Sequence, residues 1–292
     1  MNTEKIIKAG KIASEVKKYA RTIVKKDVPL FEIAEKIEKK IMDLDGKPAF
    51  PVNLSINNIA AHYTPNYDDK TLAYGLIKID LGVHVEGWLA DTAFSIDLEN
   101  SQENKKLIEA SEKALEQAQK LIKEKIELNK IGHEIQKTIE SYKFSPIINL
   151  CGHEMKQYDL HAGVSIPNID DKRLETIKKS LYAIEPFATT GSGRVHDGKP
   201  SGIYHLISEK NVRSPTAREV LEFIIKEYDK LPFCSRWLVK KFGTKSLFAL
   251  KQLEENGNLH HFPQLVEIEN SKVSQAENTV LIDKEIIITT RD

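Results

Sequence analysis

The sequence predicts an α+β protein made of two similar halves, with a mainly helical unit inserted into the second half. Three observations favour this fold class. A pair of helical segments occurs twice along the chain, and each pair is followed by a segment rich in strands and loops. A third helical region then interrupts the second of these segments. Two α-α-β halves of similar size indicate an internal duplication with a site between the halves.

The two helix pairs are predicted from apolar residues that recur at intervals of three and four positions. In the first pair, Thr3 is expected to cap a helix near the start of the chain, and a second helix follows Pro29. In the second pair, the same spacing predicts helices around residues 107–121 and 131–142. The apolar positions that define the four helices are Ile6, Ala9, Ala13, Val16, Ala20 and Ile23; Leu30, Ile33, Ala34, Ile37 and Ile41; Leu107, Ala110, Ala114, Ala118 and Leu121; and Ile131, Ile135, Ile139 and Tyr142.

Residues 76–98 are predicted to form a β-hairpin, because two alternating apolar runs flank a turn near Glu86–Gly87. Asp80 lies before this turn, and Asp91 lies after it. With an even-numbered loop the two aspartates share one face and lie opposite or diagonal to each other, whereas an odd-numbered loop separates them. At cross-strand distances of about 4.5–8 Å, two carboxylates can hold a pair of ions, and without ions they repel each other.

Residues 209–262 are predicted to form the inserted unit. Ser214–Pro215 begins its first helix, a short helix surrounds Trp237, and a third helix ends before Gly257 and the strand FPQLVEI. Three helices and a strand resemble a winged-helix unit. With ten basic and seven acidic residues, the insert is expected to form a wall of the cleft and not to bind DNA. Residues 1–208 and 263–292 are predicted to form the main domain.

The composition describes an ordinary globular protein. Of its 292 residues, 40% are hydrophobic and 29% charged, and the 43 basic residues equal the 43 acidic ones, so no specific nucleic-acid partner is expected. Cys151 and Cys234 form no zinc-binding pattern, which favours a reducing compartment. The first twenty residues alternate apolar and charged side chains, unlike a signal peptide or membrane span. We therefore expect a cytoplasmic protein without a membrane partner.

Five residues with metal-binding side chains occur in short distinctive segments. IKIDLGVHVEGWLADTAF contains Asp80 and Asp91, LCGHE contains His153, IEPFATTG contains Glu185, and AENTVLI contains Glu277. Taken singly, each residue has a structural explanation, because loop histidines and charged residues at strand ends are common. Taken together, four carboxylates would carry four negative charges, which two divalent cations balance. The combination predicts a two-metal hydrolytic centre.

The chain resembles the type II methionine aminopeptidases in their short archaeal form. The segments AAHYTPN, IDLGVHVEGWLADTAFS, NLCGHEMKQYDLHAGVSIPN, AIEPFATTGSGRV and AENTVLI are similar to that family's site segments and follow its order. The resemblance covers essentially the whole chain, and the insert between Glu185 and Glu277 is the feature that separates type II from type I. It implies the pita-bread fold, in which two pseudo-symmetric halves enclose a curved antiparallel sheet with helices outside.

The resemblance also implies a role for each metal-binding residue. Asp80 chelates one of two divalent ions, and Asp91 and Glu277 bridge both. His153 and Glu185 complete the coordination of the second ion. Hard oxygen ligands with one imidazole suit Co, Mn, Fe or Zn, and the sequence does not choose among these metals.

Further residues are implied to act on the substrate. His62 and His161 lie outside the metal site and contact the peptide, while Glu185 accepts and returns a proton. Phe50 and Leu160 are candidates for the walls of an apolar methionine pocket, with ordinary core packing as the alternative. A small second residue is expected in the substrate, because the family's second pocket is cramped.

The implied activity is the removal of the N-terminal methionine from nascent proteins and peptides. A dipeptidase or X-Pro aminopeptidase of the same fold is one alternative, although the first helix begins near Thr3 and leaves no room for the extra N-terminal domain usual in those relatives. A non-catalytic relative that binds RNA or the ribosome is the other alternative, and such proteins tend to lose their metal ligands. A monomer is expected, and transient ribosome association would suit an enzyme that acts on emerging chains.

Overall fold

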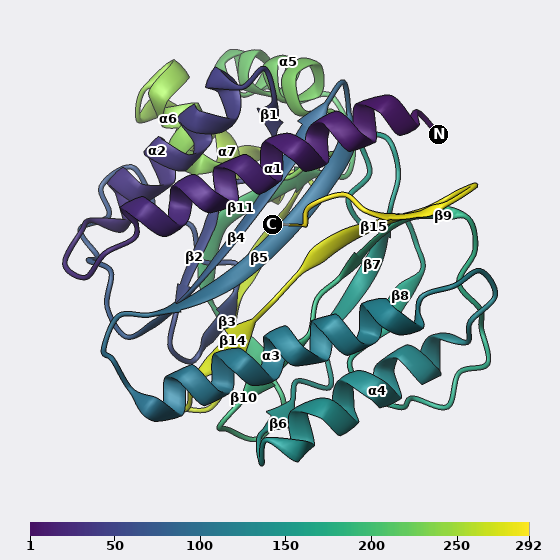
Figure 1. The fold of residues 1–292 in the computed structure, drawn as a ribbon. Helices are drawn as coiled ribbons and strands as arrows, with labels where there is room; N and C mark the ends of the chain where they lie inside the picture. The colour runs from purple at the N-terminus through teal and green to yellow at the C-terminus, as the bar shows by residue number, and fades with distance from the viewer. Residues whose placement is uncertain (292) are drawn as a thin grey trace.

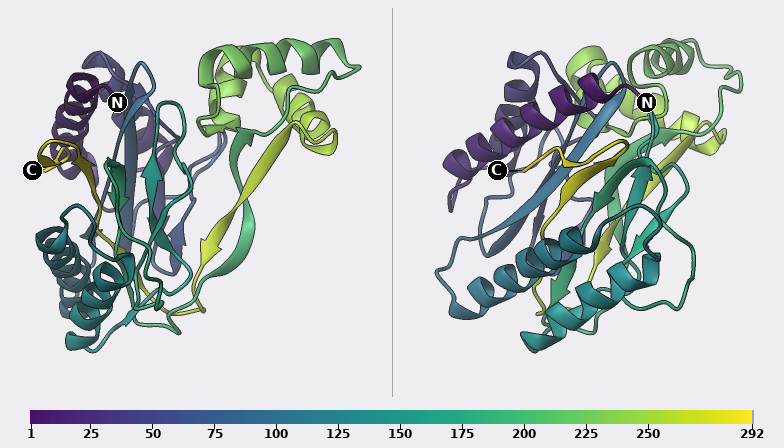
Figure 2. Two further views of the ribbon diagram at one scale, coloured as in Figure 1. Left: turned by 90° about the vertical axis from the view of Figure 1, so that its right-hand side faces the viewer. Right: turned by 45° about the vertical axis from the view of Figure 1, so that its right-hand side comes forward.

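The computed structural model describes residues 1–291. Four helices lie on the outer side of curved antiparallel sheet, and a long two-stranded ribbon carrying three more helices lies on the other side (Figure 1; left view of Figure 2). The fold thus has a helical layer, a sheet layer and a third layer formed by the inserted region. This arrangement confirms the predicted α+β class and the two α-α-β halves.

The first helix pair consists of α1 (Thr3–Ile23) and α2 (Leu30–Asp43). The expectation that Thr3 caps α1 is wrong, because the cap is the preceding residue, Asn2, whose side chain accepts a hydrogen bond from the backbone of Lys5. Asparagine is as good a cap as threonine, and it places Thr3 inside the first turn. The apolar faces of both helices pack against the hairpin strands in one continuous core.

The second helix pair, α3 (Gln102–Leu121) and α4 (Leu128–Ser141), has a core of its own. Ser101 caps α3 through a hydrogen bond from the backbone of Asn104. The existence of one apolar core in each half explains why the helical spacing was visible in the sequence, since each helix buries a single stripe against its own sheet.

Backbone geometry reveals the duplication directly. The backbone has positive φ at Asp27 and Lys125, which lie three residues before α2 and α4, respectively. Positive φ occurs again at Asp45 and Lys143, two residues after the ends of the same helices. The segment before each helix also forms the same two backbone hydrogen bonds to a later segment of its own half. In the first half Asp27 N donates to Ala73 O and Leu30 N to Thr71 O, and in the second half Lys125 N donates to Ile177 O and Leu128 N to Glu175 O.

The strands form four sheets, and all of the pairings between them are antiparallel within the described residues. The sheet of the first half is β1 (Lys47–Pro48), β2 (Asn53–Ile56), β4 (Leu76–Val85) and β5 (Trp88–Asp97); that of the second half is β7 (Cys151–Met155), β8 (Ser165–Pro167), β9 (Ser180–Ile184), β15 (Asn278–Ile282) and β16 (Ile286–Ile288). The smaller sheet is β6 (Ser145–Pro146), β10 (Phe187–Thr189) and β14 (Val273–Gln275).

The inserted region consists of three helices on a β-ribbon. Its helices are α5 (Pro215–Tyr228), α6 (Ser235–Phe242) and α7 (Lys245–Glu255), and they share a third apolar core. The ribbon and its neighbours are β11 (His196–Leu206), β13 (Leu259–Val266), β12 (Phe233–Cys234) and β3 (Ile59–Ala61). We propose the division expected from the sequence, with residues 209–262 as the inserted subdomain and β11 and β13 as its connections.

The segment after β16 packs tightly against α1. Ser14 Oγ donates to Arg291 O at 2.9 Å, and Lys17 Nζ donates to Thr290 O at 2.9 Å. A Cβ atom added to Gly10 would lie 2.3 Å from Thr289 O, so this position of the helix admits only glycine without movement of the segment. Gly10, Ser14 and Lys17 therefore hold residues 289–291 along one face of α1.

The Gly10→Ala substitution is expected to lower the free energy of unfolding by about 1–3 kcal/mol, the usual cost of overpacking. Alanine normally stabilises a helix interior relative to glycine, so the sign of the effect reports the close contact with Thr289. Thermal unfolding measures the change, with Lys11→Ala on the exposed face of the same helix as the control. An alanine variant as stable as the wild type would show that the C-terminal segment moves aside freely.

Within residues 1–291, no helix combines the length and the apolar character that are needed to cross a membrane.

Candidate active site

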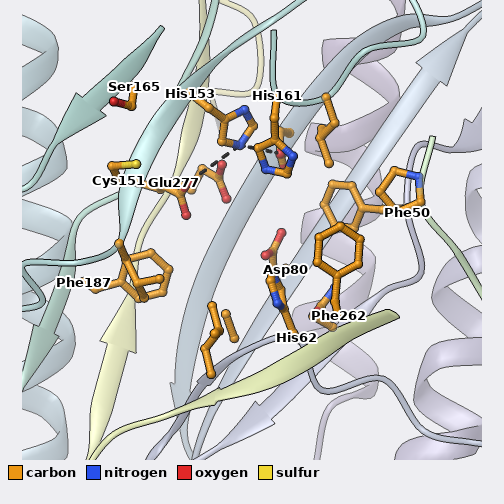
Figure 3. A pocket seen from close by; sticks show the side chains of 18 of the residues that line it. Phe50, His62, Asp80, Cys151, His153, His161, Ser165, Phe187, Phe262 and Glu277 are labelled. Atoms are coloured by element: carbon orange, nitrogen blue, oxygen red, sulfur yellow. Dashed lines mark ion pairs between the residues drawn. The ribbon is translucent and has the colours of Figure 1, made fainter. Parts of the chain in front are cut away.

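A cavity of about 450 Å³ is lined on one side by the sheet layer and on the other by the β11–β13 ribbon. It is lined by residues from both halves and from the inserted region, and Figure 3 shows their side chains converging on it. All nine residues that the sequence singled out line this cavity: Phe50, His62, Asp80, Asp91, His153, Leu160, His161, Glu185 and Glu277. The two chain halves and the insert thus supply different parts of one site.

The β4–β5 hairpin positions Asp80 and Asp91. Its loop is the two residues Glu86 and Gly87, both with positive φ, as a tight hairpin turn requires. The register pairs Asp80 with Ala93 and Gly82 with Asp91, so the two aspartates are diagonal neighbours on one face. Of the two alternatives, the even-numbered loop is the one present, and it places both aspartates on one face.

The other three candidate metal-binding side chains come from adjacent strands of the second half. His153 lies on β7, opposite Ala183 of β9, while Glu185 follows the end of β9. Glu277 immediately precedes β15, whose Asn278 pairs with Ile184. Because β7, β9 and β15 are neighbours, these three side chains emerge at the same place although they are distant in sequence.

The two halves join at this point. Glu277 N donates to Ala93 O at 2.9 Å, and Asp91 N donates to Thr279 Oγ1 at 2.7 Å. Thr92 Oγ1 in turn donates to Glu277 O at 2.8 Å. These bonds fix β5 of the first half against the start of β15, and they bring the two carboxylates together.

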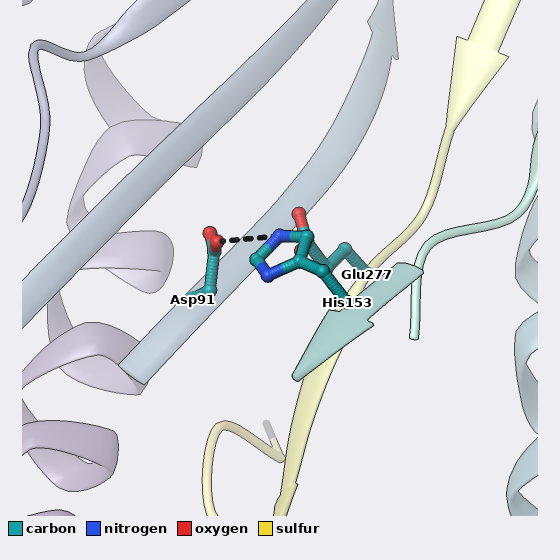
Figure 4. A group of neighbouring side chains, drawn as sticks. All are labelled: Asp91, His153 and Glu277. Atoms are coloured by element: carbon teal, nitrogen blue, oxygen red, sulfur yellow. Dashed lines mark ion pairs between the residues drawn. The ribbon is translucent and has the colours of Figure 1, made fainter. Parts of the chain in front are cut away.

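Distances within the cluster are short enough for shared coordination of an ion. His153 Nε2 lies 3.7 Å from Asp91 Oδ2 and 3.6 Å from Glu185 Oε1. One ligand atom from each of Asp91, His153 and Glu277 lies within 4.8 Å of the other two (Figure 4). Asp80 projects into the same space from β4 (Figure 3).

The carboxylates lie in an environment that disfavours their negative charge. Burial, and then the charges of Asp80 and Glu185, raise the pKa of Asp91 well above its ordinary value. Burial likewise raises the pKa of Glu185 and Glu277, with further contributions from the neighbouring carboxylates. Burial raises the pKa of Asp80 to about 7. Such a concentration of buried acidic groups needs cations to remain ionised.

The unpaired atoms of the cluster fit metal ions. Among residues 1–291, the buried atoms Asp80 Oδ1, Asp91 Oδ1 and Glu277 Oε1 have no hydrogen-bond partner. Buried polar atoms without a partner are rare in proteins because they cost free energy, so these oxygens indicate a ligand. Four carboxylates and one imidazole form a donor set suited to divalent transition ions.

Gln275 belongs to the site and was missed from the sequence. Its Nε2 lies 3.5 Å from Glu185 Oε2 and 3.4 Å from Glu277 Oε2, and its hydrogen bond lowers the pKa of Glu185 and of Asp80 against the effect of burial. The signal was the spacing of Gln275 and Glu277, because residues two apart in an extended segment face the same side.

His62 and His161 lie beside the carboxylate cluster. The rings of His161 and His153 are 4.5 Å apart. His62 has φ 63°, and its Nδ1 lies 3.2 Å from Pro263 O, which leaves Nε2 for another partner. Burial lowers the pKa of His62 to about 4, so this ring is neutral near pH 7. A neutral imidazole with Nδ1 bonded to a carbonyl carries its proton there and presents Nε2 as an acceptor. Nε2 can donate only after protonation of the ring, or after a change of tautomer that gives up the bond to Pro263 O.

Apolar residues form the side of the cavity next to the metal-binding residues. Phe50 and Leu160 belong to one buried cluster, and a Cβ added to Gly82 would lie 2.3 Å from the ring of Phe50. The inserted region contributes Phe262 (Figure 3) and Ile203 to the cavity lining, and the sequence analysis identified neither of them as a site residue. No local pattern marks these two residues, because only the folding of the ribbon over the sheet brings them to the cavity.

The comparisons with known proteins agree with this geometry. Residues 4–284 match the model of metallopeptidase family M24. The chain is 44% identical to the protein named methionine aminopeptidase from Pyrococcus abyssi, over all of both chains. It is 45% identical to the methionine aminopeptidase of Methanocaldococcus jannaschii, covering 99% of this chain and 98% of that protein.

A solved structure shows the same fold at low sequence identity. The structure of a thermophilic Arx1 superimposes with a TM-score of 0.85 at 16% identity, covering 99% of this chain and 91% of that one. The family match and the full-length archaeal relatives carry the assignment. The chain belongs to metallopeptidase family M24 and, within it, to the archaeal type of methionine aminopeptidase, a metalloaminopeptidase with the pita-bread fold.

Proposed function

We propose that this protein removes the N-terminal methionine from nascent proteins and peptides whose second residue is small. The observation that carries the proposal is the convergence of five metal-binding side chains beside an apolar cavity. The archaeal relatives named methionine aminopeptidase support the choice of substrate. We place the reaction in the cytoplasm, with the protein acting as a monomer and contacting the ribosome transiently.

Two divalent ions are proposed to occupy the cluster, and Co, Mn, Fe and Zn are all compatible with its ligands. Asp80 would hold one ion, Asp91 and Glu277 would bridge the two, and His153 and Glu185 would hold the second. When bound, the ions would supply a water nucleophile at neutral pH and polarise the scissile carbonyl. Gln275 would keep Glu185 and Glu277 in place between the metal-binding positions.

The remaining residues would bind and orient the peptide. Glu185 is proposed to accept a proton and to return it to the departing amine. His161, which lies beside His153, and His62, which lies beside Phe262, would contact the peptide group that is cleaved (Figure 3). Phe50 and Leu160, together with Phe262 of the insert, would surround the methionine side chain.

The His62→Ala variant is expected to lower kcat by about tenfold, the usual cost of losing one hydrogen bond to the reacting peptide, with metal content unchanged. His62 lies outside the group formed by Asp91, His153 and Glu277, so its loss should leave the ions in place. Metal analysis and steady-state kinetics on the same preparation separate the two effects. Loss of the metal ions from this variant would contradict the role proposed for His62.

The proposed activity is tested with peptides and metals together. Metal-free protein would be titrated anaerobically with Co, Mn, Fe and Zn, and release of methionine from Met-Gly-Met would be compared with cleavage of X-Pro peptides. We expect metal-dependent cleavage of Met-Gly-Met only. Preference for X-Pro peptides would favour the X-Pro aminopeptidase alternative, and tight metal binding without cleavage of either peptide would favour a non-catalytic protein.

A further inference from the structure

Two histidines outside the carboxylate cluster face each other across the β11–β13 ribbon. His205 of β11 pairs directly with His260 of β13. Their rings are 5.3 Å apart between centroids, and the ring planes are inclined by 36°. His205 is half-buried and His260 is exposed, so the pair is open to ions from solvent.

The ring nitrogens of this pair have no hydrogen-bond partner in the described part of the chain. Within residues 1–291, neither ring hydrogen-bonds to the protein, whereas the neighbouring His261 accepts a hydrogen bond from Gly202 N through Nε2 and lies 3.6 Å from Glu254. His62 is likewise engaged, with Pro263 O. Among the described residues, the ribbon therefore places a directly opposed pair of histidines without hydrogen-bond partners beside His261, which has such a partner.

The distance between the two rings matches the distance expected for two imidazoles that bind the same ion. With metal–nitrogen bonds of about 2.0–2.1 Å and a tetrahedral angle, two imidazoles on one ion have centroids about 5 Å apart. The observed 5.3 Å between the ring centroids is close to this value. Directly opposed residues of an antiparallel pair also have Cβ atoms only about 4.5–5.5 Å apart, which makes such a pair a natural chelate.

Phe262 fixes the pair and places it next to the cavity. Its ring lies 5.0 Å from the ring of His205 and 4.8 Å from that of His260, both in edge-to-face contact. The same phenylalanine lines the cavity and lies 5.4 Å from the ring of His62. Burial lowers the pKa of His205, with smaller contributions from His260 and His161, which favours the neutral form that binds metals.

We propose that His205 and His260 form a second metal site, separate from the carboxylate cluster, for one divalent transition ion. Two imidazoles without a carboxylate select Zn²⁺, Ni²⁺ or Cu²⁺ over Mg²⁺, Ca²⁺ or Mn²⁺. Water fills the remaining coordination positions. The two sites differ in chemistry, because the carboxylate cluster offers mainly hard oxygen ligands.

The site can be tested by measurements of metal binding alone, without an activity assay. The carboxylate cluster would first be filled with Mn²⁺, and uptake of Ni²⁺ would then be measured by calorimetry and that of Cu²⁺ by electron paramagnetic resonance. We expect one additional ion per chain, with two nitrogen ligands in the Cu²⁺ spectrum. The His205→Ala and His260→Ala variants should each bind this ion about tenfold or more weakly, because a single imidazole remains.

His196→Ala is the matched control, because His196 is an exposed histidine at the other end of β11, opposite Val266. It should bind the additional ion as the wild type does. The variants His205→Asn and His260→Asn repeat the test with a polar side chain kept at each position. Thermal unfolding of these variants checks that they remain folded. Unchanged Ni²⁺ affinity in either histidine variant, or no uptake beyond the Mn²⁺-filled cluster, would overturn the proposal.

Discussion

The Asp91→Asn variant is expected to lose more than about 100-fold in activity, since even the loss of an outer partner of a metal ligand costs 10–100-fold. Asp91 is buried, lies 3.7 Å from His153 Nε2 and faces Asp80 diagonally across the hairpin. The neutral amide removes one negative charge from the group that is proposed to balance two divalent ions. Activity and bound metal, measured on the same samples, should fall together.

The same variant should be more stable than the wild type when both are free of metal. Burial and the charges of Asp80 and Glu185 disfavour ionised Asp91, and an amide of the same shape removes that repulsion. Added metal should then stabilise the wild type much more than the variant. Asp68→Asn, the same change at an exposed position, is the control for both measurements. A metal-free Asp91→Asn variant that unfolds more easily than the wild type would contradict the view that these carboxylates repel one another.

The Arg236→Ala variant is expected to lose about 3–5 kcal/mol of unfolding free energy, the usual cost of removing one partner from a buried ion pair. The guanidinium is 2% exposed and hydrogen-bonds to both carboxylate oxygens of Glu38 at 2.7–2.8 Å. It also donates to Glu35 and to the backbone oxygen of Pro65. Without it, Glu38 would be left as a buried charge paired only with neutral groups.

Arg236 belongs to α6 of the insert, whereas Glu35 and Glu38 belong to α2, so the loss should also loosen the insert against the first half. Because Ile203 and Phe262 reach the cavity from the insert's ribbon, we expect a higher KM for peptides as well. Lys240→Ala is the control: this lysine forms an exposed ion pair with the same Glu35, and its loss should cost no more than about 1 kcal/mol. Equal destabilisation by the two substitutions would show that the buried network does not hold the insert.

The elements with regular local patterns could be predicted from the sequence. Each of the four outer helices buries one apolar stripe, and the hairpin turn is marked by Glu86–Gly87, so local spacing was sufficient. The N-cap of α1 was misplaced by one residue, because Asn2 and Thr3 are both good caps and only the hydrogen bond to Lys5 distinguishes them.

The chemistry of the candidate site was also visible in the sequence, since four carboxylates and a histidine in distinctive segments predict cations wherever they meet. Gln275 was missed because the prediction from the sequence counted charged side chains that cations must neutralise, and an amide is uncharged. Ile203, Phe262 and the His205–His260 pair were missed because their positions depend on how the ribbon lies over the sheet.

The amino-acid sequence by itself determined which residues form the helices and the hairpin and which side chains can bind metal, because those properties depend on local spacing and on the chemistry of single residues. Only the tertiary structure decided that Asp91 and Glu277 lie side by side through β5 and β15, that a ribbon from the insert closes the cavity, and that two histidines face each other on that ribbon. These features join residues far apart in the chain, and their positions follow from strand pairing and core packing, which no local pattern records.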